Sequence, residues 1–165
     1  MKRTILFILL MNIPLFSQNG NVLKWEQLAV CLPNLEKVSD LRRGEVSGDN
    51  DPEAIVSILY YNSPEIMERS KEIQIIIGDY LIHQESLEEA LTEAPDISKP
   101  ILINEKYKGV KIIATYDSVV DYCTYHIVVA GRFLITFHSS TDGDFTKEIE
   151  MLIANIDYAK LEKLK

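Results

Sequence analysis

Three polar residues near the middle of the sequence could do acid–base chemistry. Asp79 follows a run of isoleucines, and His83 and Glu85 come just after it, where a predicted strand gives way to a predicted helix. An imidazole and a carboxylate within hydrogen-bond reach form a common general acid–base pair, so the three residues could be catalytic if the strand end and the helix start converge on a cleft. Such a cluster is also typical of the polar start of a helix, and we favour that interpretation.

A calcium loop is a second candidate for chemistry. Asp49, Asp51 and Glu53 alternate as oxygen ligands do, but Ala54 and Tyr60 stand where an EF-hand needs glycine and glutamate. The sequence also has no Gly-x-Ser-x-Gly, His-Glu-x-x-His, P-loop or Gly-x-Gly-x-x-Gly pattern. We therefore predict no catalytic, cofactor-binding or metal-binding residues, and no cofactor.

Two histidines flank a predicted hairpin. Gly131 and Arg132 separate two alternating apolar runs, and a Gly-X pair in this position favours a tight type II′ turn. Such a turn would place His126 opposite Phe137, and His138 would then point to the other face of the sheet. We therefore expect no two-histidine metal site.

The chain has two cysteines, Cys31 and Cys123, and no C-x-x-C motif. In an oxidising compartment they could form a disulfide that closes a loop of roughly 90 residues and stabilises the fold by about 4 to 5 kcal/mol in the chain-entropy model. Cys123 lies in the middle of a predicted strand, however, where a free cysteine acts as a small apolar residue. Both alternatives stay open.

The first eighteen residues have the composition of a secretory signal peptide. Lys2 and Arg3 precede an almost wholly apolar stretch from Ile5 to Phe16, and small and polar residues follow at 17–20. The apolar stretch is shorter than the ~20 residues of a membrane-spanning helix. We expect cleavage after about residue 18 and a periplasmic or secreted protein.

The expected mature chain is strongly acidic. The whole sequence has a net charge of −8, and removing two cations with residues 1–18 leaves 15 − 25 = −10. Nucleic acids and anionic membrane surfaces attract basic proteins, so we expect neither as a partner.

The rest of the sequence, residues 19–165, is long enough for one globular domain. Its centre, 109–139, alternates between apolar and polar residues like three consecutive antiparallel strands. Further strands are expected at 40–46, 54–61, 72–77 and 100–107, and helices at 22–32, 84–92 and 145–156. This order predicts an α+β fold, a mainly antiparallel sheet flanked by helices in an α/β/α sandwich.

The order of elements resembles a known family. A short helix before Leu32-Pro33, a weak strand around Gly44, a meander containing Ala130 to Phe133 and a terminal amphipathic helix resemble the PsbP-like α/β/α sandwich of small accessory proteins. The resemblance carries no catalytic residues and implies an accessory or binding role.

Together these observations predict an exported, non-catalytic accessory or binding protein of the bacterial cell envelope, with a protein of the envelope as its partner. Two alternatives stay open. One is an inhibitor or immunity-type protein that blocks a partner, and the other is an enzyme with a dispersed active site.

Overall fold

The computed structural model describes residues 21–68, 71–81, 98–102, 108–116, 120–141 and 146–165, and the predicted signal peptide lies outside these ranges. In chain order the elements are α1 (Trp25–Ala29), β1 (Lys37–Val38), β2 (Leu41–Asp49), β3 (Ile55–Tyr61), the 3-10 turn η1 (Ile66–Glu68), β4 (Glu72–Asp79), β5 (Ser98–Leu102), β6 (Lys108–Tyr116), β7 (Val120–Val129), β8 (Phe133–Thr141), α3 (Thr146–Ala154) and α4 (Tyr158–Lys163).

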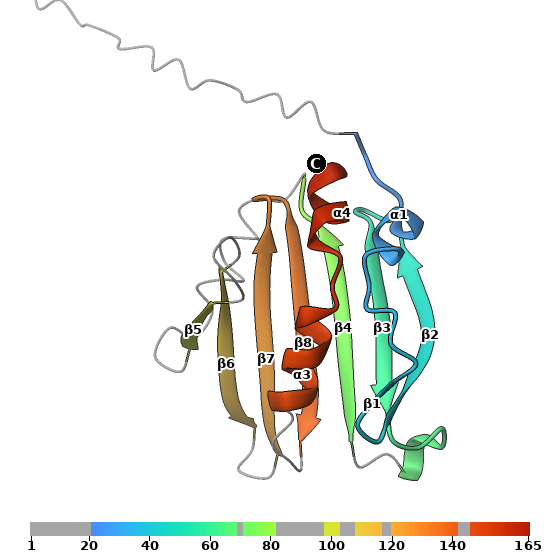
Figure 1. Cartoon of the computed structure of the whole chain (residues 1–165), viewed down its shortest axis with the longest axis vertical. Helices are drawn as coiled ribbons and strands as arrows, with labels where there is room; N and C mark the ends of the chain where they lie inside the picture. The colour runs from blue at the N-terminus through green and yellow to red at the C-terminus, as the bar shows by residue number, and fades with distance from the viewer. Residues whose placement is uncertain (1–20, 69–70, 82–97, 103–107, 117–119, 142–145) are drawn as a thin grey trace, which may run out of the picture.

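The eight strands that the structure describes belong to one antiparallel sheet with the order β1-β2-β3-β4-β8-β7-β6-β5 (Figure 1). The sheet consists of two meanders, β1 to β4 and β5 to β8, in which each strand pairs with the next one along the chain. β4 joins them at the centre by pairing with β8 over its whole length, from Glu72 opposite Ser140 to Asp79 opposite Phe133.

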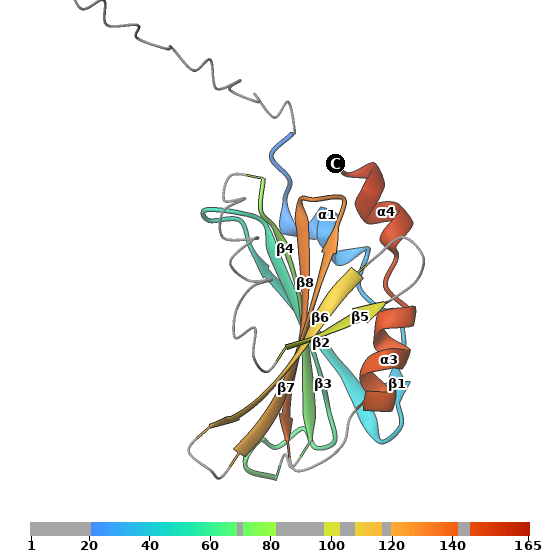
Figure 2. The ribbon, with the colours of Figure 1, turned by 90° about the vertical axis from the view of Figure 1, so that its left-hand side faces the viewer.

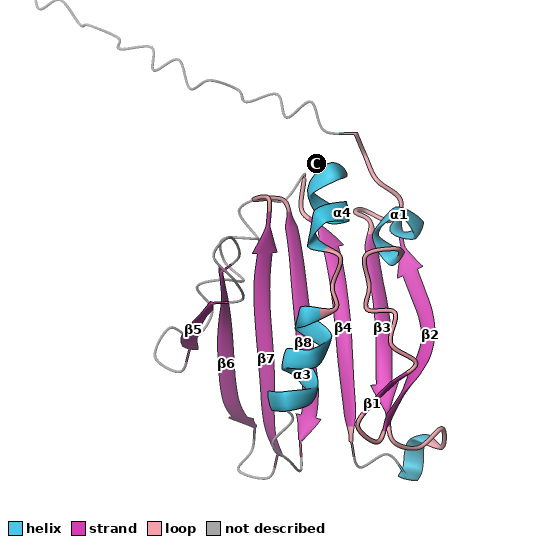
Figure 3. Ribbon diagram, in the orientation of Figure 1, coloured by secondary structure: helices cyan, strands magenta, loops and turns pink. Residues whose placement is uncertain are grey.

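The predicted α/β/α sandwich is wrong, because the protein is mainly β. A curled antiparallel sheet dominates the structure, and the described helices are short (Figure 3). α1, α3 and α4 all lie on one face of the sheet (Figure 2). The apolar pattern at 22–32 predicted a longer helix than α1, and Leu23, Cys31 and Leu32 instead reach the core from non-helical segments. The helix predicted at 84–92 lies outside the described residues.

The core lies between the sheet and these helices. Ile73, Ile75 and Ile77 of β4 are completely buried. Alternating residues of the strands beside it are also buried: Val56, Ile58 and Tyr60 of β3, Tyr125, Ile127 and Val129 of β7, and Phe133, Ile135 and Phe137 of β8. This period of two is what a strand with one face on a core requires. We call this the inner face and the opposite side of the sheet the outer face.

The C-terminal helices close the core, and the first of them, α3, lies within the helix predicted at 145–156. In α3 and the turn after it, Ile149, Leu152 and Ile156 are buried at helical spacing. Asp157 then begins α4, where its side chain accepts a hydrogen bond from the Lys160 backbone N–H at 3.0 Å, and Leu161 is fully buried.

The β7–β8 turn differs from the predicted type II′ turn. Val129 pairs with Phe133, so three residues form the loop, and both Ala130 and Gly131 have positive φ angles, 56° and 64°. Alanine rarely adopts this conformation, which is why the sequence pointed to Gly131 alone. Arg132 stays outside the ladder of β7 and β8, and its carbonyl accepts the Tyr80 N–H at 2.9 Å.

Candidate functional site

Four polar side chains form a patch on the outer face of β7 and β8. The Thr124 hydroxyl lies 3.2 Å from Nδ1 of His138, and the Thr136 hydroxyl lies 3.2 Å from Nδ1 of His126. Each pair crosses from one strand to the other. We call Thr124, His126, Thr136 and His138 the Thr-His patch.

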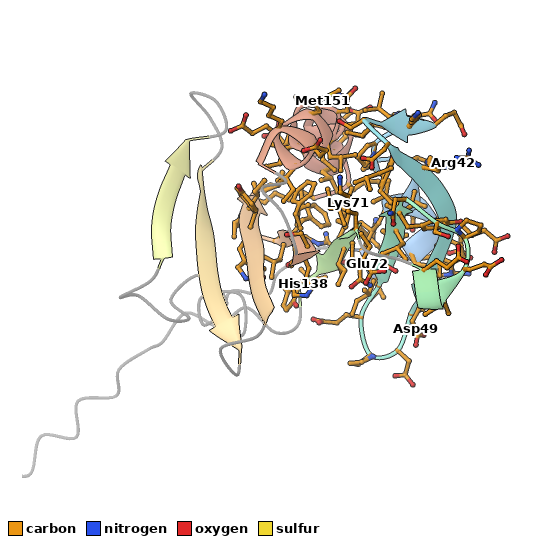
Figure 4. All side chains as sticks on the ribbon, turned by 90° about the horizontal axis from the view of Figure 1, so that it is seen from below. Arg42, Asp49, Lys71, Glu72, His138 and Met151 are labelled. Atoms are coloured by element: carbon orange, nitrogen blue, oxygen red, sulfur yellow. The ribbon has the colours of Figure 1, made fainter. Side chains whose placement is uncertain are left out.

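The strand register creates this patch. Thr124 stands opposite His138, and His126 stands opposite Thr136. The prediction that the two histidines point to opposite faces is therefore wrong, because the three-residue loop shifts the register by one residue and a shift of one turns every side chain to the other face. Figure 4 shows His138 on the side of the sheet away from Met151 of α3.

The neighbouring strand β4 extends the patch. Gln74 stands opposite His138, and Ile76 stands opposite Thr136. Gln74, Ile76 and His138 are partly exposed, whereas Thr124 and His126 are only 8% and 9% exposed. The outer face thus combines hydroxyl, imidazole and amide groups with apolar side chains, and this composition suits hydrogen bonding to a bound molecule rather than nucleophilic chemistry.

The predicted acid–base cluster is described in part. Asp79 is buried at the end of β4 and forms a bidentate ion pair with Arg132, in which Nε lies 2.7 Å from Oδ1 and Nη2 lies 2.6 Å from Oδ2. His83 and Glu85 lie outside the described residues. The pairing commits both carboxylate oxygens of Asp79, which also accepts the Leu81 N–H at 3.1 Å.

Sequence reasoning missed the role of Arg132. The residue occupies the β7–β8 loop, where an arginine ordinarily points to solvent, but its side chain is only 3% exposed. Its guanidinium also lies over the Phe133 ring, 5.2 Å from the centroid. Nothing in the local pattern connects it with Asp79, since 53 residues separate the two.

Cys31 is a free thiol buried in the core. Burial raises the pKa of this thiol to about 11; the nearby Asp157 carboxylate adds to the rise and Lys160 opposes it. The thiolate is the reactive form, so the folded protein protects Cys31 from oxidation and alkylation. The side chain of Cys123 is not among those described, and Cys31 is a free thiol in this structure rather than part of a disulfide with Cys123.

The acidic turn after β2 is held by its own backbone. The Asp49 carboxylate accepts the N–H groups of Asn50 at 2.6 Å and Asp51 at 3.2 Å, and the Asn50 side chain accepts the Trp25 N–H at 2.7 Å. In the part of the chain that the structure describes, no three His, Cys, Asp or Glu residues are grouped as metal ligands would be.

Two tyrosines have raised pKa values, in both cases chiefly because of burial. The nearby Glu53 carboxylate raises the pKa of Tyr80 further. The Tyr60 hydroxyl donates a hydrogen bond to the Leu35 carbonyl at 2.8 Å on the inner face. The Tyr60 hydrogen bond ties the segment before β1 to the sheet and is structural.

Comparison with known proteins gives no assignment. No family model matches the chain, and no curated protein and no solved structure is significantly similar to it. The resemblance to PsbP-like proteins therefore rests on the order of elements alone. Among the described helices, none is long and apolar enough to cross a membrane.

Proposed function

We propose that this protein is an exported accessory or binding protein of the bacterial cell envelope and that it binds a protein partner through the outer face of its sheet. The observation that carries the proposal is the Thr-His patch. It places the partly exposed Thr136 and His138, held by the nearly buried His126 and Thr124, next to the partly exposed Gln74 and Ile76 on the face opposite α1, α3 and α4.

A protein partner suits this composition better than a charged polymer. Protein interfaces combine apolar and hydrogen-bonding side chains, as Ile76, Gln74 and His138 do on this face. The net charge of −8 disfavours nucleic acid and anionic lipid, since both bind through clustered Lys and Arg side chains.

Binding is also favoured over catalysis by the state of Asp79. Both oxygens of the Asp79 carboxylate already accept hydrogen bonds from the buried Arg132 guanidinium. An acid–base mechanism at Asp79 would first require this pair to break, which is costly for buried charges.

The proposal is tested by affinity capture from envelope extract with three versions of the chain as bait: unchanged, with Gln74→Ala and His138→Ala on the outer face, and with Met151→Ala on α3. Met151 is 48% exposed on the helix side and serves as the control. We expect one partner to be retained by the unchanged chain and the control and reduced at least tenfold by the outer-face variant.

Circular dichroism and melting curves must show that all three versions are folded. A partner captured equally by all of them would contradict the outer face as the binding surface. Turnover of a substrate by the purified chain, abolished by His83→Ala while the fold is kept, would favour the enzyme alternative instead.

A further inference from the structure

The Arg132 guanidinium contacts three separate parts of the chain. Besides the bidentate pair with Asp79 of β4, Nη2 donates to the Asn21 carbonyl at 2.8 Å and Nη1 donates to the Leu164 carbonyl at 3.3 Å. Asn21 precedes α1 and Leu164 follows α4. One side chain therefore holds both ends of the described chain against the sheet.

These contacts have the features of strong hydrogen bonds. The donor is a charged guanidinium, and the Arg132 and Asp79 side chains are only 3% and 5% exposed. Removing one member would leave the other charge buried without its partner, and mutational studies of buried pairs show that this is strongly destabilising.

The two ends also contact each other close to this point. The Asp157 N–H, just before α4, donates to the Cys31 carbonyl at 3.0 Å, and Lys160 Nζ lies 3.5 Å from the Val30 carbonyl. In Figure 1, α1 and α4 lie at the same end of the sheet, where β4 ends and β7 turns into β8.

We propose that Arg132 is a latch that fastens the segment before α1 and the helix α4 to the sheet as one unit, so that the two are held or released together. Opening the latch uncovers Cys31, which is now fully buried and is bonded through its carbonyl to the start of α4. The latch is a conformational device of the fold and involves a different part of the molecule from the outer face.

Arg132→Lys in the full chain tests the latch. Lysine keeps the charge, but an ammonium cannot reproduce the planar set of donors that reaches Asp79, Asn21 and Leu164 at once. We expect iodoacetamide to alkylate Cys31 about 10 to 100 times faster in Arg132→Lys than in the unchanged chain, which is the factor for losing one or two charge-assisted hydrogen bonds. Peptide mapping measures the extent of alkylation.

Hydrogen exchange gives the second readout. In Arg132→Lys, exchange should rise in residues 21–32 and in 157–165 together, while 73–77 and 133–137 stay protected. The control is Lys71→Ala, which removes an ion pair with Asp40 between side chains that are 42% and 57% exposed. This control should change neither Cys31 alkylation nor exchange at either end of the chain.

Leu161→Ala tests the coupling from the other side. Leu161 is fully buried in α4, so its truncation loosens α4 and, through the latch, should also raise exchange in residues 21–24. In the Arg132→Lys background, the same truncation should have little further effect on 21–24. Unchanged exchange at 21–24 in Leu161→Ala would overturn the proposal, and this result can be obtained even if Arg132→Lys does not fold. If Arg132→Lys does fold, increased exchange at only one end of the chain would also overturn the proposal.

Discussion

Ile76 and Ile77 are neighbours in β4 that point to opposite faces of the sheet, so the same substitution at each tests how the faces are assigned. Ile77 is completely buried and stands between Val56 of β3 and Ile135 of β8, both also completely buried. Ile76 is partly exposed on the outer face. Ile→Ala removes three carbon atoms in either case.

The expected magnitudes follow from burial. Transfer of three carbons out of the core costs about 2.4 kcal/mol at ~0.8 kcal/mol each, and the cavity that remains raises the loss at Ile77 to about 3 to 5 kcal/mol. At Ile76 most of the cavity term is absent because water fills the space, and the loss should be about 1 kcal/mol.

Urea denaturation followed by circular dichroism measures both losses. With a slope on the order of 2 kcal/mol per molar urea, Ile77→Ala should lower the midpoint by about 1.5 to 2.5 M and Ile76→Ala by about 0.5 M. Equal midpoints, or a larger loss for Ile76→Ala at an unchanged slope, would refute the assignment of the inner and outer faces.

Three further results are expected. The intact mass of the exported protein should place its N-terminus near Gln18 to Gly20, and a full-length mass in the membrane fraction would contradict export as a cleaved protein. Gly48→Ala should destabilise the fold by about 1 to 3 kcal/mol and alter Trp25 fluorescence, because the new Cβ would overlap the Trp25 side chain, whereas Ser47→Ala should do neither. The free energy of unfolding should fall as pH rises from about 9 through 11, because the pKa of Cys31 is higher in the folded chain than in the unfolded chain. Cys31→Ala should lose this part of the pH dependence. The same pH dependence in Cys31→Ala and in the unchanged chain would contradict the burial of the thiol.

The alternating strands and the C-terminal helix could be predicted from the sequence because their signals are local. Ile73, Ile75 and Ile77 recur every second residue, and Ile149 and Leu152 recur at helical spacing, so each pattern by itself identifies the buried face. The position of Asp157 before α4 was predictable for the same reason, since a helix N-cap is defined by a few adjacent residues.

The predictions that were wrong concern features that the local sequence pattern does not determine. The register of β7 and β8 is set by Ala130 in a left-handed conformation, which sequence preferences disfavour, and a shift of one residue reversed the side of His138 relative to His126. The latch needs Asp79 and Arg132 to meet across the centre of the sheet. The predicted α/β/α sandwich was wrong because an amphipathic pattern shows that a segment has one apolar side but does not show which face of a sheet that segment covers.

The pairing of β4 with β8 has a consequence for how this chain folds. Every other neighbouring pair in the described sheet joins strands that are consecutive in the chain, so both meanders can form from short loops. Only the β4–β8 ladder must close a loop of about 50 residues, an entropic cost on the order of 3.5 kcal/mol by the loop-closure scaling. Asp79 and Arg132 lie at the end of that ladder where the intervening chain is shortest. We therefore expect the formation of the β4–β8 ladder to limit the rate of folding. The isoleucines of this ladder should influence the folding rate more strongly than apolar residues inside either meander do.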